Sequence, residues 1–163
     1  MIDVHNAFIY QAEAIANGEV WRLFTGQLLH INLQHFLYNA VALLLLWLIA
    51  KNIQYQHFWR YVVYCWLITG VGLFLFLTQV QWYLGASGFL HGVAFMVIAN
   101  YIKTYRTLGV IALSVLVVKL IYEQTLGAIG VFDFEVIVDA HLIGFIAGVL
   151  VFFYKENYGK LQK

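Results

Sequence analysis

The sequence predicts an all-α protein, a polytopic bundle of transmembrane helices, and three observations support this fold class. Hydrophobic residues make up 63% of the 163 residues and charged residues only 10%, whereas a soluble domain carries about 25% charged residues. The mean hydropathy is +0.81. The apolar residues come in solid blocks rather than at every second position, which favours helices over the strands of a membrane barrel.

The same composition argues against a soluble enzyme, a disordered chain and a nucleic-acid-binding protein. A soluble domain needs polar groups over most of its surface, and this chain has too few. Its net charge of +1 leaves no large basic surface for nucleic acid. The single cysteine, Cys65, excludes an internal disulfide framework and a zinc site built on cysteines. We therefore expect one membrane domain over residues 1–163, without a cofactor.

The first 32 residues are expected to form an extramembrane or interfacial segment. They are amphipathic at best and lack the basic start and apolar core of a signal peptide. Trp21 and Phe24 suit the level of the lipid headgroups.

Five membrane spans follow, because five apolar runs approach the roughly 20 residues that cross a bilayer. The first run contains AVALLLLWLIA, the third lies in an uncharged stretch from Val80 to Ile102, and the fourth carries Lys119 near one end. Proline is absent, so no span is kinked by it. The predicted spans cover residues 33–50, 58–78, 86–102, 108–122 and 136–154, and a tail of residues 155–163 follows them.

The positive charges predict the orientation of the bundle. Most of the nine Lys and Arg residues fall on one side, in two turns and the tail. Cytoplasmic loops carry an excess of Lys and Arg, so we expect this side and the C-terminus to be cytoplasmic. The N-terminus and an acidic loop with Asp133, Glu135 and Asp139 would then lie outside. The residues on the basic side are Lys51, Arg60, Lys103, Arg106, Lys155, Lys160 and Lys163.

The run Gly85-Ala86-Ser87-Gly88 stands at the outer start of the third span, where polar groups require an explanation because they are costly in a bilayer. The glycines allow a sharp turn and a close approach of other chains. Ser87 is either a plain N-cap or a nucleophile whose neighbouring free N–H groups provide an oxyanion site.

His141 lies in the fifth span, three residues before Gly144 and seven before Gly148, so the three share one helix face. The two glycines form a GxxxG pair that lets another helix pack closely. On that face, His141 could accept the proton of Ser87 in a two-member dyad. Asp139 points to the opposite side, and we do not expect it to complete a triad.

His30, His35 and Asn39 gather where the first span begins, and His35 and Asn39 face the same way at i and i+4. They indicate either a metal site or a hydrogen-bond platform. No carboxylate or cysteine joins them and asparagine is a poor transition-metal ligand, so we expect no metal. As neutral donors, His35 and Asn39 could stabilise an oxyanion, while His30 could hold the loop.

His91 follows Ser87 by one turn on the same helix face and competes with His141 as the base. We favour His141, because a histidine inside the helix is better placed to pack under the site. Lys119 and Glu123 are interpreted only as charges at the outer part of the fourth span.

Together, these motifs resemble the rhomboid family of intramembrane serine proteases. The resemblance covers residues 18–154, and its four motifs occur in the order of the family. Within the family, the stretches AIANGEVWRLFTGQLLHINLQHFLYN, GASGFLHG and DAHLIG look most like the rhombosortase subfamily of bacterial rhomboids. The four motifs are Trp21-Arg22, His30-x4-His35-x3-Asn39, Gly85-x-Ser87-Gly88 and Ala140-His141-x2-Gly144-x3-Gly148.

The resemblance implies a role for each matched residue. Ser87 would be the nucleophile and His141 the general base, and His35, Asn39 and the backbone N–H of Ser87 would form the oxyanion hole. The supporting residues would hold the loop before the first span, shape the serine turn and orient His141. They are Trp21, Arg22, His30, Gly85, Gly88 and His91.

The resemblance also implies a substrate and a location. The substrate would be a membrane-spanning segment cut near its outer end. For rhombosortases it would be the C-terminal sorting signal of exported proteins, with a Gly-Gly motif before an apolar helix and a basic tail. The enzyme would lie in the bacterial inner membrane with its active site open to the periplasmic side. The family core has six spans, so we expect the first of them to be missing here.

Three other functions compete with this interpretation. An inactive rhomboid-like protein would bind membrane segments without cutting them. A channel or structural bundle would need polar residues spread along a pore, whereas here they gather toward the outer half. A metal-dependent protease would use His30 and His35 with His91 or His141, but the chain has no HExxH motif and we expect no carboxylate partner.

Overall fold

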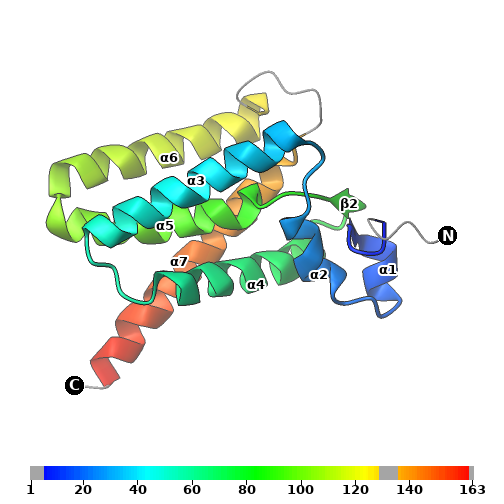
Figure 1. The fold of residues 1–163 in the computed structure, drawn as a ribbon, viewed down its shortest axis with the longest axis horizontal. Coiled ribbons are helices and arrows are strands. Elements are labelled where there is room, and N and C mark those ends of the chain that lie inside the picture. The colour runs from blue at the N-terminus through cyan, green and yellow to red at the C-terminus, as the bar shows by residue number, and fades with distance from the viewer. Residues whose placement is uncertain (1–5, 129–135, 162–163) are drawn as a thin grey trace.

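The structure, a computed structural model, describes residues 6–128 and 136–161, with side chains as far as Glu156. Within these residues the fold is a bundle of five long helices (Figure 1). Helices form at all five places where the sequence predicts spans, so the predicted all-α bundle is confirmed. They are α3 (Leu33–Asn52), α4 (Phe58–Phe76), α5 (Ser87–Thr104), α6 (Arg106–Leu126) and α7 (Val138–Leu161).

Four of these helices, namely α3, α4, α6 and the Val138–Glu156 part of α7, are long and apolar enough to cross a membrane. On α3 and α6, large apolar side chains such as Leu37, Leu44, Val115 and Val118 remain exposed. An apolar surface of this extent is suited to lipid rather than to water.

Helix α5 lies in the middle of the bundle and packs against α3, α4, α6 and α7. It carries His91, Asn100 and Lys103, and it is not among the helices that composition alone marks as able to cross a membrane. Asn100 is buried, donates to the Met96 carbonyl at 2.7 Å and accepts from Lys155 Nζ at 2.6 Å. Because its neighbours shield it from lipid, α5 can hold polar groups that a peripheral helix could not.

Glycines bring α5 and α7 into direct backbone contact. A Cβ added to Gly144 of α7 would overlap the carbonyl oxygen of Gly88 of α5, and one added to Gly148 would lie 2.7 Å from the Cα of Gly92. The GxxxG pair predicted on α7 therefore meets a matching pair on α5. Sequence reasoning missed this second pair, although Gly88 and Gly92 show the same spacing.

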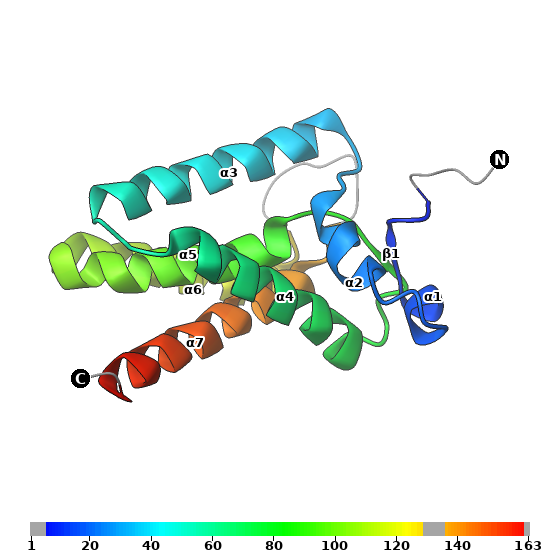
Figure 2. The same cartoon turned by 60° about the horizontal axis from the view of Figure 1, so that its bottom comes forward.

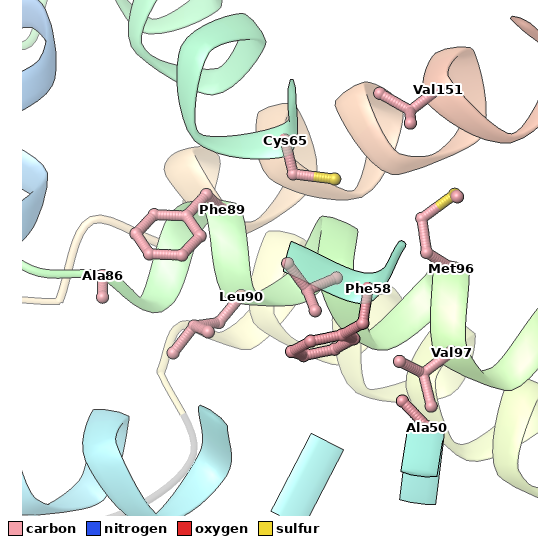
Figure 3. Close-up of a cluster of buried hydrophobic side chains, with 10 residues drawn as sticks. Ala50, Phe58, Cys65, Ala86, Phe89, Leu90, Met96, Val97 and Val151 are labelled. Atoms are coloured by element: carbon pink, nitrogen blue, oxygen red, sulfur yellow. The ribbon is translucent and has the colours of Figure 1, made fainter. Parts of the chain in front are cut away.

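Buried apolar side chains from four helices pack beside this contact (Figure 3). Cys65 of α4 and Val97 of α5 are completely buried. The cluster holds α3 and α4 to the α5–α7 pair, so the central helix is enclosed on several sides. Its members are Ala50, Phe58, Cys65, Ala86, Phe89, Leu90, Val93, Met96, Val97 and Val151.

The segment before α3 is folded and buries one charge. Arg22 is 7% exposed. Its Nη1 donates to the carbonyls of Asn6 at 2.6 Å and Ile9 at 2.9 Å, and its Nε pairs with Glu19 at 2.6 Å. Trp21 Nε1 donates to the Ala7 carbonyl at 3.1 Å. The elements here are β1 (Tyr10–Gln11), α1 (Ala12–Ala16), α2 (Arg22–Thr25) and the 3-10 turn η1 (Gly26–Leu28).

A short sheet ties this segment to the chain just before α5. β1 pairs antiparallel with β2 (Trp82–Tyr83), with Tyr10 opposite Tyr83 and Gln11 opposite Trp82. The segment therefore lies at the end of the bundle where α5 begins (Figure 2). The α3–α4 turn, the α5–α6 turn and the C-terminal end of α7 lie at the other end (Figure 1). Five of the positive charges predicted to be cytoplasmic lie in or next to these segments, namely Lys51, Arg60, Lys103, Arg106 and Lys155.

The helix ends differ from the predicted limits of the spans. α6 continues to Leu126, beyond the limit of the fourth span predicted at residue 122, and Glu123 in this extension is buried and paired. The predicted tail 155–163 is helical as far as Leu161, and α4 ends at Phe76 rather than at residue 78. Of the predicted acidic loop and tail, Asp133, Glu135 and Lys163 lie outside the described residues.

The glycine contact predicts that one added methyl group lowers the stability of the fold substantially. Gly144→Ala should lower the melting temperature of the detergent-solubilised protein, because the backbone it meets cannot move aside as a side chain can. We expect a loss of about 1–3 kcal/mol or more. Leu150→Phe adds more volume at an exposed position of the same helix and should change the melting temperature little. An unchanged value for Gly144→Ala would contradict the backbone contact.

Candidate active site

Ser87 is the first residue of α5, directly after a tight turn. Gly85 has a φ of +119°, a conformation that L side chains rarely adopt, and a Cβ there would lie 2.8 Å from His35 Nε2. Glycine therefore lets the chain turn from β2 into α5 while His35 lies against the turn. The first N–H groups of a helix have no partner within it, so Ser87 stands beside donors that can face a ligand.

Ser87 and His141 are brought together. His141 Nε2 lies 3.1 Å from Ser87 Oγ, within the range of a nucleophile–base hydrogen bond. His141 is 5% exposed and lies one turn before Gly144, where α7 touches the α5 backbone. The close helix contact thus puts the two side chains at the same level.

The Tyr83 hydroxyl forms hydrogen bonds with Ser87 and Gly88 at the start of α5. It is 3% exposed, and its hydroxyl accepts the N–H of Gly88 at 3.1 Å. Burial raises the pKa of Tyr83, and hydrogen bonds with Ser87 and Gly88 partly offset this effect. The phenol therefore stays protonated, and it can donate to Ser87 Oγ while the serine proton faces His141.

Glu123 is a member of the candidate site that sequence reasoning missed. Its Oε2 lies 2.9 Å from His141 Nδ1, and its side chain is only 4% exposed. Lys119 Nζ contacts its other oxygen, Oε1, at 2.7 Å. A Lys and a Glu four residues apart inside a span were the available signal, since paired ionisable groups in a membrane helix face inward and mark function.

His91 stacks on His141, with ring centroids 4.1 Å apart and an interplanar angle of 19°. Its Nε2 lies 2.8 Å from Lys119 Nζ, and its Nδ1 lies 2.7 Å from the carbonyl oxygen of Ser87. A lysine ammonium can only donate, so Nε2 of His91 is the acceptor. Nδ1 therefore carries the ring hydrogen and donates it in a hydrogen bond to the Ser87 carbonyl oxygen. Both nitrogens of His91 are thus engaged, and it is His141 that contacts the serine hydroxyl.

Among the other predicted donors, His35 lines a cavity together with Ser87, whereas Asn39 lines a separate groove. His35 and Ser87 line the same small cavity of about 30 Å³, enough for one water molecule. Asn39 is buried, but it lines an apolar groove of about 550 Å³ together with His30 and Ala86. Among the described residues, its Nδ2 has no hydrogen-bond partner.

His30 lies against His35, with ring centroids 5.0 Å apart in an edge-to-face arrangement. Burial lowers the pKa of His30 below its ordinary value of 6.5, and a hydrogen bond with the Leu28 backbone offsets part of this effect. Burial thus favours the neutral form of His30, which packs against His35.

The expectation that no carboxylate joins the histidines is wrong. Donor atoms of His91, Glu123 and His141 lie within 4.8 Å of one another, a spacing that could hold a metal ion. Lys119, however, donates to both Glu123 and His91, so its ammonium already supplies a positive charge to this set. Asp139, expected outside the site, accepts from Gln79 at 3.3 Å.

A family model described as the Rhomboid domain matches residues 17–157 of the chain. The match includes α2, all five long helices except the end of α7, and both Ser87 and His141. Neither a curated protein nor a solved structure matches the chain.

The lowered pKa of His30 predicts that the folded protein loses stability in acid. In the unfolded chain His30 takes up a proton near pH 6.5, whereas in the folded protein it does so only at lower pH. Stability is therefore lost as the pH falls through about 6.5. Between pH 7.5 and 5.5, the melting temperature of His30→Gln should fall less than that of the wild type, as measured by thermal unfolding. An equal loss in both proteins would contradict the pKa shift.

Proposed function

The chain belongs to the rhomboid family of intramembrane serine proteases, and we propose that it cleaves transmembrane segments with Ser87 as nucleophile and His141 as general base. The observation that carries this proposal is the 3.1 Å separation of Ser87 Oγ and His141 Nε2. A serine within reach of an imidazole is inert unless that imidazole can accept its proton, and Nε2 is the nitrogen directed at the hydroxyl.

In the acylation step, His141 Nε2 takes the proton of Ser87 while Oγ attacks the carbonyl carbon of the scissile peptide bond. The new Oγ–C bond gives a tetrahedral intermediate with a negatively charged oxygen. Collapse of this intermediate breaks the C–N bond, and His141 returns the proton to the leaving amine. The remaining part of the substrate stays on Ser87 as an ester.

The oxyanion of the intermediate requires donors that are in place before the reaction. We assign this role to the backbone N–H of Ser87 and to the side chains of His35 and Asn39. The position of His35 against Gly85, beside the serine, supports its place in this set. Asn39 lines the neighbouring groove with a buried amide nitrogen that has no partner among the described residues, and its place in the set rests on the resemblance. Gly88 N–H is already bound to Tyr83.

Deacylation needs one water molecule next to the ester. The cavity of about 30 Å³ that Ser87 and His35 line is large enough for it. His141 removes a proton from this water as its oxygen bonds to the ester carbon. The proton then returns to Ser87 Oγ as the acid product leaves.

For the substrate we propose a C-terminal sorting signal of the rhombosortase type, with Gly-Gly before an apolar helix and a basic tail. Trp82, Leu84 and Ile137 line the cavity beside Ser87 and keep it narrow. Residues without side chains fit such a space best, which supports glycines at the cleaved position. The stretch that resembles rhombosortases includes the serine turn itself.

We further propose that the protein lies in a bacterial inner membrane with the C-terminus in the cytoplasm. The positive charges at the end of the bundle opposite Ser87 support this orientation. Ser87 then opens to the periplasmic side, where an exported protein presents the outer end of its anchor.

Removal of either member of the pair should abolish proteolysis. In proteoliposomes with a Gly-Gly reporter, Ser87→Ala and His141→Ala should each give no cleavage product on gels. Ser114→Ala removes an exposed serine of α6 and should cut like the wild type. Cleavage by Ser87→Ala would overturn the serine-protease proposal. A wild-type protein that binds the reporter without cutting it would instead be an inactive relative.

Substrate choice is tested with the same reporter. Replacing its Gly-Gly by Leu-Leu should lower kcat/KM at least about tenfold, because large side chains do not fit the narrow cavity. A reporter with altered residues at the far end of the apolar helix serves as the control. Equal cleavage of both sequences would refute the rhombosortase-type specificity and leave the protease assignment intact.

A further inference from the structure

We propose that Glu123 is a positioning residue that makes the serine–histidine pair into a Ser87–His141–Glu123 triad, with Lys119 holding the carboxylate. This inference rests on the proposed function. The chain of contacts runs from Ser87 Oγ to His141 Nε2 at 3.1 Å and from His141 Nδ1 to Glu123 Oε2 at 2.9 Å. Glu123 does not contact Ser87 and acts only through His141.

The carboxylate determines which nitrogen of His141 carries the proton. Glu123 is an acceptor when ionised, so the proton of neutral His141 stays on Nδ1 and Nε2 presents its lone pair to Ser87. When His141 takes the serine proton, the resulting imidazolium lies against a negative charge. Glu123 stabilises this charged intermediate and is not itself protonated.

Lys119 determines which way the carboxylate faces. Its Nζ donates to Glu123 Oε1 at 2.7 Å and to His91 Nε2 at 2.8 Å. Oε1 is thereby occupied, and Oε2 is left for His141. Lys119 also supplies the positive charge that a carboxylate with 4% exposure needs, because a buried charge without a partner is very costly.

The contacts close into a ring that begins and ends on Ser87. One path runs from Lys119 through Glu123 and His141 to the serine hydroxyl, and the other from Lys119 through His91 to the serine carbonyl. His91 also stacks on His141 at 4.1 Å. Both the tilt of the imidazole and its tautomer are therefore held, as a proton-transfer group requires.

A plain ion pair between Lys119 and Glu123 is the competing explanation. It accounts for the 2.7 Å contact but not for the placement of the second carboxylate oxygen on His141 Nδ1. A buried pair is by itself weak support for stability, since apolar residues of similar size often serve as well. The two explanations differ in what happens when the carboxylate becomes an amide.

Glu123→Gln tests this difference. Lys119 can only donate, so it will hold the amide oxygen and turn the amide NH2 toward His141. His141 must then accept at Nδ1 and carry its proton on Nε2, which cannot take the serine proton. We expect kcat to fall by about 10²–10⁴, as when the carboxylate of a serine-protease triad becomes an amide. KM should stay within about twofold, because Glu123 does not touch substrate.

The double variant Glu123→Gln/Lys119→Met gives the decisive comparison. Without Lys119 the amide can turn its oxygen to His141, and kcat should recover on the order of tenfold over the single variant. The double variant holds no unpaired charge, so it keeps the test valid if Glu123→Gln unfolds. Melting temperatures are measured in parallel. Glu156→Gln is the matched control, since it makes the same carboxylate-to-amide change in a lysine pair, Lys103–Glu156, at the other end of the bundle.

The proposal is overturned if Glu123→Gln keeps a wild-type kcat while Ser87→Ala is inactive, and the protease function then stands. It is also overturned if the double variant shows no recovery over Glu123→Gln, or if kcat and melting temperature fall together in every variant. Absence of cleavage by the wild-type protein would instead refute the proposed function on which the triad rests.

Discussion

The backbone contact between α5 and α7 is the constraint on which the rest of the structure depends. Ser87 directly precedes Gly88, and His141 lies one turn before Gly144, so the contact between these glycines sets the two side chains at one level. A side chain at Gly144 would overlap the carbonyl oxygen of Gly88 and force the two helices apart. The 3.1 Å approach of His141 to Ser87 is thus a consequence of two residues that carry no chemistry themselves.

This close packing also explains how a membrane helix can carry a Lys and a Glu. On α6, Val115 and Val118 face outward, whereas Lys119 and Glu123 turn toward α5 and α7. Charged groups are tolerated in a bundle when they pair with one another and face its interior. Here the pair has two further partners, His91 and His141, which a purely stabilising pair would not need.

The sequence predicted the helices, the serine turn and the glycine face of His141, because local spacing determines each of these. It did not predict the partner of His141, because Glu123 lies 18 positions earlier on another helix, and only the packing of α6 against α7 brings the two side chains together. Asn39 shows a second limit. It is one turn from His35 on α3, yet His35 lines the cavity at Ser87 whereas Asn39 lines the apolar groove. Helix periodicity predicts a face but not what occupies the space in front of it.

The hydrogen-bonded ring connects α5, α6 and α7, and α3 lies outside it. α6 cannot shift without breaking both contacts of Lys119 and, through them, the orientation of His141 and of the Ser87 carbonyl. α3 packs mainly against α5 and contributes no member of the ring, although it carries His35. A displacement of α3 therefore leaves the contacts among Ser87, His141 and Glu123 in place, whereas a displacement of α6 separates His141 from Glu123.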